Sequence, residues 1–473
     1  MDFTSDTTYC VNHHESTQKS RSMPFARCAS RRNRISAVFA LTVLAGLLAF
    51  TAGASGEVLR DSVRSDSALA ASGPAAGRDY IAEVRSNFTP ENRRYSNLRS
   101  ALGFAGVGWD VALGLFLLFS GLSARFRDAA YRRSGNRYMR MLVYFALFTG
   151  VGLLLSLPFN WYRGFYVEHA FGLSNQSLSE WFLDELKGGL VTVIGLGATG
   201  LVALAYLGIE KSPRRWWLWL AAGTLPVLLI AQVLVPIAVD PLFNRFTPLR
   251  DQQLKAQILS LAERAGIPGR NVYEVDRSRQ TKKFNAYVSG WGVSQRIVLW
   301  DTTLKGMKTD EILFVMAHEM GHYRLAHIWK GVLYASALSF VLFFLSGILM
   351  RRAVARFGPR WGFTELHDAA SVPLFMVAVT LLSFVADPLS NMASRVVEHE
   401  ADVFAVEVTH DNDAGARTFL KLGSQNRSNP EPAPVIVWFQ YSHPPLIERI
   451  RFALEYRPWE EGKPNRFYRP VNR

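Results

Sequence analysis

Two histidines and a glutamate in the middle of the chain have the spacing of a metal-dependent hydrolase site. Residues 318–322 read His-Glu-Met-Gly-His, which is the HExxH pattern. On a helix, His318 and His322 lie about 40° apart around the axis, so both imidazoles can meet one Zn²⁺ at ~2.0–2.1 Å. Glu319 lies beside them and can act as the general base toward a water that the metal activates. One zinc ion per chain is therefore the expected cofactor.

This five-residue pattern has three fixed positions and often occurs by chance, so its surroundings must support it. Residues 309–329 are predicted to form one helix, and Ile312, Leu313, Val315 and Met316 indicate that it is buried. Imidazole and carboxylate groups are seldom buried without partners. A third ligand is needed to complete a site.

Glu398 is the best candidate for the third ligand. It lies in an acidic segment at 394–407, where Asp402 follows four residues later and shares its helix face, whereas Glu400 points about 200° away. We expect Glu398 to bind the metal and Asp402 to accept a hydrogen bond from a ligating imidazole, which fixes its tautomer. The alternative is a solvated acidic helix face, but the segment is rich in apolar residues.

His327 fits the third position less well. It lies five residues after His322, whereas the metzincin pattern needs six, and Leu325 stands where that pattern has glycine. A site of two histidines and one glutamate, with a fourth position left open, is the remaining choice.

Composition and hydropathy patterning indicate a polytopic membrane protein. The 473 residues are 49% hydrophobic and 19% charged, and the apolar residues fall into long blocks. The net charge of +14 comes from arginines beside these blocks, which is typical of membrane flanks and not of a nucleic-acid partner. Cys10 and Cys28 both lie near the N-terminus, so neither a disulfide framework nor a cysteine metal site is expected.

The apolar blocks define the expected fold. Residues 1–34 are basic and predicted to be disordered, and 35–54 are either a secretory signal peptide or a first membrane helix. Most of the later blocks reach the ~20 residues that cross ~30 Å of hydrocarbon, and a soluble core could account for only one or two of them. We expect a mainly α fold with about seven transmembrane helices, the later six near 104–122, 141–158, 189–209, 216–238, 329–350 and 371–389.

The polar insertion at 239–328 is predicted to be a small α+β unit. It contains a helix at 249–265, a strand at 271–275 and two alternating runs, 283–288 and 296–300, which suggest a β-hairpin before the HExxH helix. An edge strand beside a metal site can hold an extended peptide through main-chain hydrogen bonds.

The chain is thus expected to divide into three parts after its first 54 residues. They are an N-terminal membrane domain at 55–238, a zinc metallopeptidase domain at 239–457 that includes the last two spans, and a C-terminal tail at 458–473. Both ligand segments adjoin a span, so we expect the metal at the edge of the membrane. Its substrates should be peptides or proteins already held at the lipid bilayer.

Several segments taken together resemble the Ste24-type CAAX prenyl proteases of the M48 zinc metallopeptidases. The resemblance covers about 85–455 and rests on FYVEHAFGLSNQS, DPLFNRFTPL, FNAYVSG, RIVLWDTTL, HEMGH, SRVVEHEAD and YSHPPLIERI. It implies zinc held by His318, His322 and Glu398, with Glu319 as general base.

The resemblance also implies further site residues. Asn285 would contact the substrate main chain, His443 would stabilise the oxyanion, and Arg449 would support the site and the bound substrate. On the residues alone, Asn285 could simply end a strand and His443 could form a structural turn before two prolines. The family fold is a ring of membrane helices around a water-filled chamber, which would account for Asp110 and Asp387 within apolar blocks.

Three functions stay open at this point. Members of the family remove the last three residues of prenylated C-terminal CAAX peptides, and some act in membrane-protein quality control without prenyl specificity. A membrane transporter or receptor with an incidental HExxH is the alternative from another class.

The expected location is a bacterial inner membrane, with the orientation undecided. Arginines gather at 21–34, 125–140, 211–215 and 351–360, and the positive-inside rule places these segments in the cytoplasm and the unit at 239–328 outside. The family resemblance instead favours a cytosol-facing active site. Arginines at 55–100 weaken the charge argument, which still favours the outside.

Overall fold

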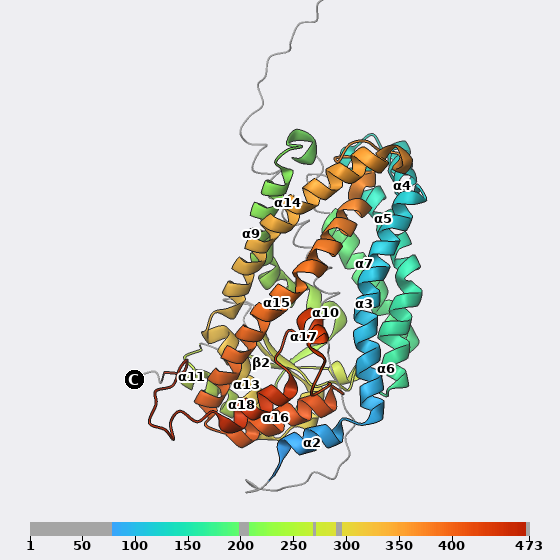
Figure 1. The fold of residues 1–473 in the computed structure, drawn as a ribbon. Coiled ribbons are helices and arrows are strands. Elements are labelled where there is room, and N and C mark those ends of the chain that lie inside the picture. Colours follow the sequence, from blue (N-terminus) through green and yellow to red (C-terminus); the bar gives the residue numbers. More distant parts are fainter. Residues whose placement is uncertain (1–77, 198–207, 268–270, 290–295, 470–473) are drawn as a thin grey trace, which may run out of the picture.

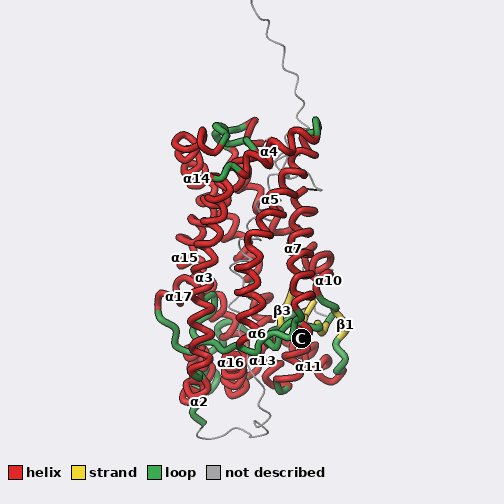
Figure 2. Tube along the Cα trace, turned by 90° about the vertical axis from the view of Figure 1, so that its right-hand side faces the viewer, coloured by secondary structure: helices red, strands yellow, loops and turns green. Residues whose placement is uncertain are grey.

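The structure is a computed structural model that describes residues 78–197, 208–267, 271–289 and 296–469. Long helices run along one axis, and a small sheet with short helices closes one end (Figure 1). We call this the sheet end, and we call the opposite end, with α4 (Leu122–Arg133), the distal end. The view turned by 90° shows the same separation of strands from the distal end (Figure 2).

Five described helical stretches are long and apolar enough to cross a bilayer. They begin at α3 (Pro90–Phe119), α5 (Arg137–Asn160), α9 (Trp216–Leu234), α14 (His327–Trp361) and α15 (Val372–Thr409). α5 continues through η1 (Trp161–Tyr166) and α6 (Val167–Ala170), α9 continues through η2 (Val235–Val239) and α10 (Asp240–Phe243), and η5 (Ala369–Ser371) precedes α15.

These five stretches contain five of the seven predicted spans. α7 (Leu178–Gly197) holds the first part of the block predicted at 189–209, and residues 198–207 of that block lie outside the described residues. The segment at 35–54 also lies outside them, so seven spans remain a prediction. Large apolar side chains such as Leu154 and Val385 are 66% and 74% exposed, as expected where lipid takes the place of water.

The last predicted span lies within a longer helix. Residues 371–389 are predicted to cross the membrane, and α15 runs unbroken through Pro388 for 38 residues, or roughly 57 Å at 1.5 Å per residue. Glu398 and Asp402 therefore lie on the same helix as the span. The membrane helix itself positions the proposed third ligand.

In chain order, the strands of a four-stranded sheet come after the first three membrane stretches and before the last two. Its strands are β1 (Phe246–Pro248), β2 (Val272–Val275), β3 (Ala286–Ser289) and β4 (Arg296–Trp300), in the order β1-β2-β4-β3. β4 pairs parallel with β2 and antiparallel with β3. The helix and the first strand that we predicted lie at α11 (Gln252–Arg264) and β2. β3 and β4 pair as a hairpin would, but their connection at 290–295 lies outside the described residues, so the hairpin turn stays a prediction.

The HExxH motif lies on α13 (Thr309–Arg324), which follows α12 (Asp301–Gly306). Glu311, in the first turn of α13, is fully buried. Its carboxylate pairs with the Lys421 ammonium at 2.7 Å and with the Arg417 guanidinium at 3.2 Å, and both cations come from α16 (Asn412–Gln425). These ion pairs fix the start of α13. α2 (Tyr80–Asn87), α17 (Pro434–Gln440) and α18 (Leu446–Glu455) complete the sheet end, together with η3 (Arg277–Arg279).

The predicted single helix over 309–329 is wrong at its end. α13 stops at Arg324, the backbone turns through Ala326 with φ at 57°, and α14 begins at His327. A left-handed conformation is costly for a residue with a Cβ, so it persists only where neighbouring contacts enforce it.

α13 and α15 pack closely against each other at Gly321, within the HExxH motif. A Cβ at this position would lie 3.1 Å from the Cβ of Phe404 and 3.2 Å from the Cα of Ala401. The glycine therefore allows α15 to approach closely enough for Glu398 to lie against both histidines.

We predict that Gly321→Ala destabilises the protein by about 1–3 kcal/mol, because the added methyl group must push α15 away from α13. The matched control is Gly331→Ala on α14, where a Cβ would meet nothing within 4 Å and should be neutral or slightly stabilising. Thermal unfolding in detergent compares the two. Equal melting temperatures for both variants would contradict the close approach.

Candidate active site

Three side chains from α13 and α15 bring their polar atoms together at the sheet end. His318 Nε2 lies 3.1 Å from His322 Nε2 and 3.2 Å from Glu398 Oε2, and His322 Nε2 lies 3.5 Å from Glu398 Oε1. Each residue thus offers one ligand atom within 4.8 Å of the other two. The sequence placed these three residues in one site, and the structure brings them together.

The donor set fits a tetrahedral metal. Ligands that bind one ion at ~2.0–2.1 Å in tetrahedral geometry lie ~3.3 Å from each other, which is close to the spacing observed here. Glu398 Oε2 is also buried without a hydrogen bond of good geometry, and such an orphaned acceptor is costly unless a cation neutralises it. Two imidazoles and one carboxylate are ligand types that zinc accepts.

Asp402 binds His318 on the side of the ring opposite the metal position. Its Oδ1 accepts a hydrogen bond from His318 Nδ1 at 2.8 Å, so Nε2 is left to face Glu398 and His322. The guanidinium of Arg449, on α18, binds both oxygens of Asp402, at 2.7 and 2.9 Å. Arg449 therefore acts on the site through Asp402, although it also lines the cavity in which a substrate would lie.

Electrostatics at His318 favour a bound cation. Burial opposes a charge on the imidazole, but the hydrogen bonds and negative charges of Asp402 and Glu398 outweigh it and raise the pKa of His318 to about 10. Arg449 has its pKa raised too, because the charge and hydrogen bonds of Asp402 overcome the cost of burial.

Glu319 lies beside the histidine pair, as its position in the motif predicts. Burial raises the pKa of Glu319, while the two imidazoles and the Val288 backbone amide of β3 work in the opposite direction. A carboxylate with a raised pKa is a stronger base, which suits proton transfer near neutral pH.

His443 lies on the other side of Glu398. Its Nε2 is 3.1 Å from Glu398 Oε2 and its Nδ1 is 2.9 Å from the Ser442 hydroxyl. The side chain is 52% exposed, toward the cavity that it helps to line. The surrounding protein atoms desolvate the imidazole and so lower the pKa of His443, although the charge of Glu398 opposes this effect. The lowered pKa favours the neutral imidazole.

Two residues near the site were missed or set aside by the sequence reasoning. His327 Nδ1 lies 3.1 Å from His322 Nδ1, and His327 Nε2 lies 3.0 Å from Glu400 Oε2. From the sequence, the spacing of His327 does not suit a ligand, and Glu400 faces away from Glu398. Both facts hold, but the break at Ala326 turns His327 back toward the site, and no sequence signal marks that break.

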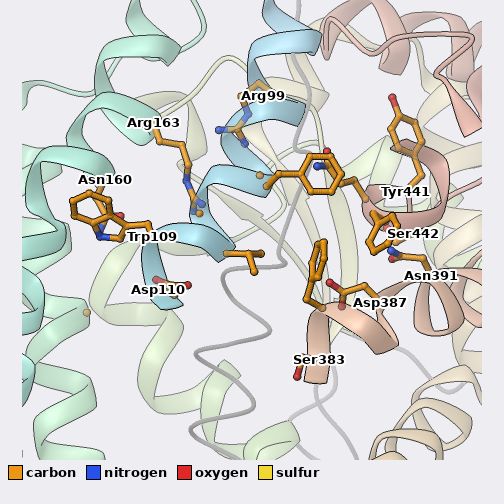
Figure 3. Close-up of a pocket in the computed structure, with 18 of the residues that line it drawn as sticks. Arg99, Trp109, Asp110, Asn160, Arg163, Ser383, Asp387, Asn391, Tyr441 and Ser442 are labelled. Atoms are coloured by element: carbon orange, nitrogen blue, oxygen red, sulfur yellow. The ribbon is translucent and has the colours of Figure 1, made fainter. Parts of the chain in front are cut away.

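A cavity of about 1120 Å³ joins the site to the membrane helices. His318, Glu319 and His443 line it at the sheet end, and so does Asn285 at the start of the edge strand β3. Polar residues of the membrane helices also line its wall (Figure 3), among them Arg99, Asp110, Asn160, Arg163, Ser383, Asp387 and Asn391. The family resemblance implies a chamber beside Asp110 and Asp387, and both residues line this cavity.

Comparison with known proteins links both halves of the chain to one group. Residues 248–457 match the family described as Peptidase family M48, and residues 81–245 match "CAAX prenyl protease N-terminal, five membrane helices". The Uncharacterized metalloprotease YhfN of Bacillus subtilis is 34% identical over 76% of this chain and 84% of that protein.

Eukaryotic proteins are similar over much of their length. The CAAX prenyl protease 1 homolog of Dictyostelium discoideum is 31% identical over 66% of this chain and 73% of its own, and that of Arabidopsis thaliana is 28% identical over 80% and 90%. The crystal structure of S. mikatae Ste24p superimposes with a TM-score of 0.67 at 25% identity, over 91% of this chain and 100% of that one.

A metal ion must compete with a proton for His318, so metal affinity should depend on pH. Because the pKa of His318 is raised to about 10, its proton is bound at pH 6–8 and must leave when a metal binds. We predict that Zn²⁺ affinity rises by about tenfold per pH unit over this range. Competition with a chromophoric chelator measures it, and an affinity that stays constant or falls as pH rises would contradict the prediction.

Proposed function

Because the chain belongs to peptidase family M48, and to its CAAX prenyl protease type, it is an integral-membrane metallopeptidase, and we propose that it cleaves peptides with one Zn²⁺ held by His318, His322 and Glu398. The observation that best supports this ligand set is the convergence of two imidazole nitrogens and a carboxylate from α13 and α15. A transporter or receptor needs no such convergence, and the comparisons do not favour one.

In this proposal the chain's own residues move the protons. Zn²⁺ supplies Lewis-acid activation of the attacking water and of the substrate carbonyl. Glu319 takes a proton from the water as its oxygen bonds to the carbonyl carbon, and then gives that proton to the amine nitrogen as the carbon–nitrogen bond breaks. We propose that His443, whose Nε2 lies 3.1 Å from Glu398 Oε2, donates a hydrogen bond to the developing oxyanion.

The substrate strand is proposed to lie along β3. The backbone N–H and C=O of Asn285 are already bonded to Thr303, and its Oδ1 accepts from the Ala286 amide at 2.9 Å. Among the described residues its side-chain Nδ2 has no partner, so this group can donate to a substrate carbonyl. We propose that Arg449 positions Asp402, and a direct substrate contact from its guanidinium stays a prediction.

The substrates are peptides or proteins at the membrane, and we propose that they include prenylated C-terminal CAAX peptides. Relatives from several eukaryotes are named for that activity, and the cavity reaches from the site into the membrane helices. Membrane-protein quality control without prenyl specificity is the second candidate. The domain division at about residue 239 also stays a proposal, supported by the two family matches that meet near residue 246.

Glu319→Gln tests the proposed chemistry. The amide can keep its hydrogen bonds but cannot take a proton, so we predict that kcat falls by about 10²–10⁴-fold while stoichiometric zinc is retained. The assay measures cleavage of a prenylated CAAX peptide and of its unmodified counterpart by detergent-purified protein, with Glu365→Gln, the same substitution at an exposed glutamate in the loop before η5, as a matched control.

The two peptides separate the candidate substrates. Cleavage of the prenylated peptide alone supports CAAX processing, and equal cleavage of both supports quality control. Unchanged turnover in the Glu319→Gln variant would show that Glu319 is not the general base, and it would contradict the proposed mechanism.

We propose that the protein lies in a bacterial cell membrane with its sheet end outside. A group of exposed arginines gathers at the distal end, on α4 and at the ends of α5, α9 and α14 (Figure 1): Arg125, Arg132, Arg133, Arg137, Arg214, Arg215, Arg351, Arg352, Arg356 and Arg360. The positive-inside rule places this end in the cytoplasm.

A reporter fused after the last residue tests the orientation, because the described chain ends near the sheet end (Figure 1). We predict that alkaline phosphatase, which is active only outside the cytoplasm, is active in this fusion and that a fluorescent protein active only in the cytoplasm is dark. The reverse pattern would place the sheet end in the cytosol.

A further inference from the structure

The two histidines of the motif are held from behind by different partners. His318 bonds directly to a carboxylate, Asp402, through Nδ1. His322 has no carboxylate at its Nδ1 among the described contacts, and bonds instead to a second imidazole, that of His327, at 3.1 Å. His327 is only 5% exposed and bonds in turn to Glu400 at 3.0 Å.

The hydrogen-bond pattern admits one consistent set of tautomers. Nε2 of His322 faces His318 and Glu398, so as a metal ligand it must carry a lone pair and the proton must sit on Nδ1. That proton is donated to His327 Nδ1, which leaves the second proton of the pair on His327 Nε2. There it is donated to Glu400 Oε2, which can only accept.

The backbone supports a dedicated role for His327. It is the first residue of α14, directly after Ala326 in the left-handed region with φ at 57°. Such a conformation is costly for a residue with a Cβ and clusters at functional sites. A continuous helix would place His327 about 140° from His322, facing away from it. The break turns its imidazole back onto His322.

We propose that His327 and Glu400 are positioning residues that fix the tautomer and ring orientation of His322 for metal binding. Glu400 lies two residues from Glu398 on α15, so this helix holds both histidines from behind: His318 through Asp402, and His322 through Glu400 and His327. We call the hydrogen-bonded chain His322–His327–Glu400 the relay. Lys330 contacts Glu400 at 3.1 Å from outside this chain, and its side chain is 54% exposed. The inference rests on the metal site of the proposed function.

Metal affinity of four variants tests the relay. Loss of an outer hydrogen-bond partner typically weakens metal binding by 10–100-fold, so Glu400→Ala and His327→Ala should each weaken Zn²⁺ binding by about that factor. Glu400→Gln keeps an acceptor for His327 and should stay within about threefold of the wild type. Lys330→Ala is the matched control and should also stay within about threefold.

Affinity is measured at one fixed pH by chelator competition with the full-length protein in detergent, beside the melting temperature of each metal-free form. Wild-type affinity in both alanine variants would overturn the relay, and so would an equal loss in Glu400→Gln and Glu400→Ala. A loss that follows the metal-free melting temperature across the variants would show a merely structural role. Failure of the wild type to bind zinc would instead overturn the proposed function itself.

Discussion

The hydrogen bond between Asp402 and His318 is the contact on which the rest of the site depends. It joins the motif helix α13 to the long membrane helix α15, it fixes which nitrogen of His318 faces the metal position, and Arg449 anchors it from α18. An aspartate buried this deeply would be costly without such partners. Because α15 is one unbroken helix from the distal end to Thr409, this contact also ties the chemistry rigidly to the membrane-spanning part of the protein.

The arrangement assigns different tasks to the two sides of α15. One side gives Glu398 and Asp402 to the histidines of α13, and another gives Glu400 to the start of α14. Close packing is possible because Gly321 has no side chain where α13 meets Ala401 and Phe404. The edge strand β3 and the cavity then determine from which direction a peptide can approach Glu319.

Much of the site follows from the sequence, because its spacing rules act within single helices. One helical turn separates His318 from His322 and Glu398 from Asp402, so each pair could be placed on one face before any fold was known. The length of the apolar blocks likewise identified the membrane helices. The break at Ala326 and the continuity of α15 through Pro388 could not be foreseen, since both depend on tertiary contacts that override local preference. The link from His327 to Glu400 follows from that break, and so it was also hidden.

The most direct test of the account is the metal's own coordination, measured by zinc X-ray absorption on the purified full-length protein. We predict a first shell of nitrogen and oxygen atoms at ~2.0–2.1 Å with the multiple-scattering signature of two imidazoles. A spectrum with sulfur ligands, with fewer than two imidazoles, or without stoichiometric zinc would contradict the claim that α13 and α15 together hold the metal.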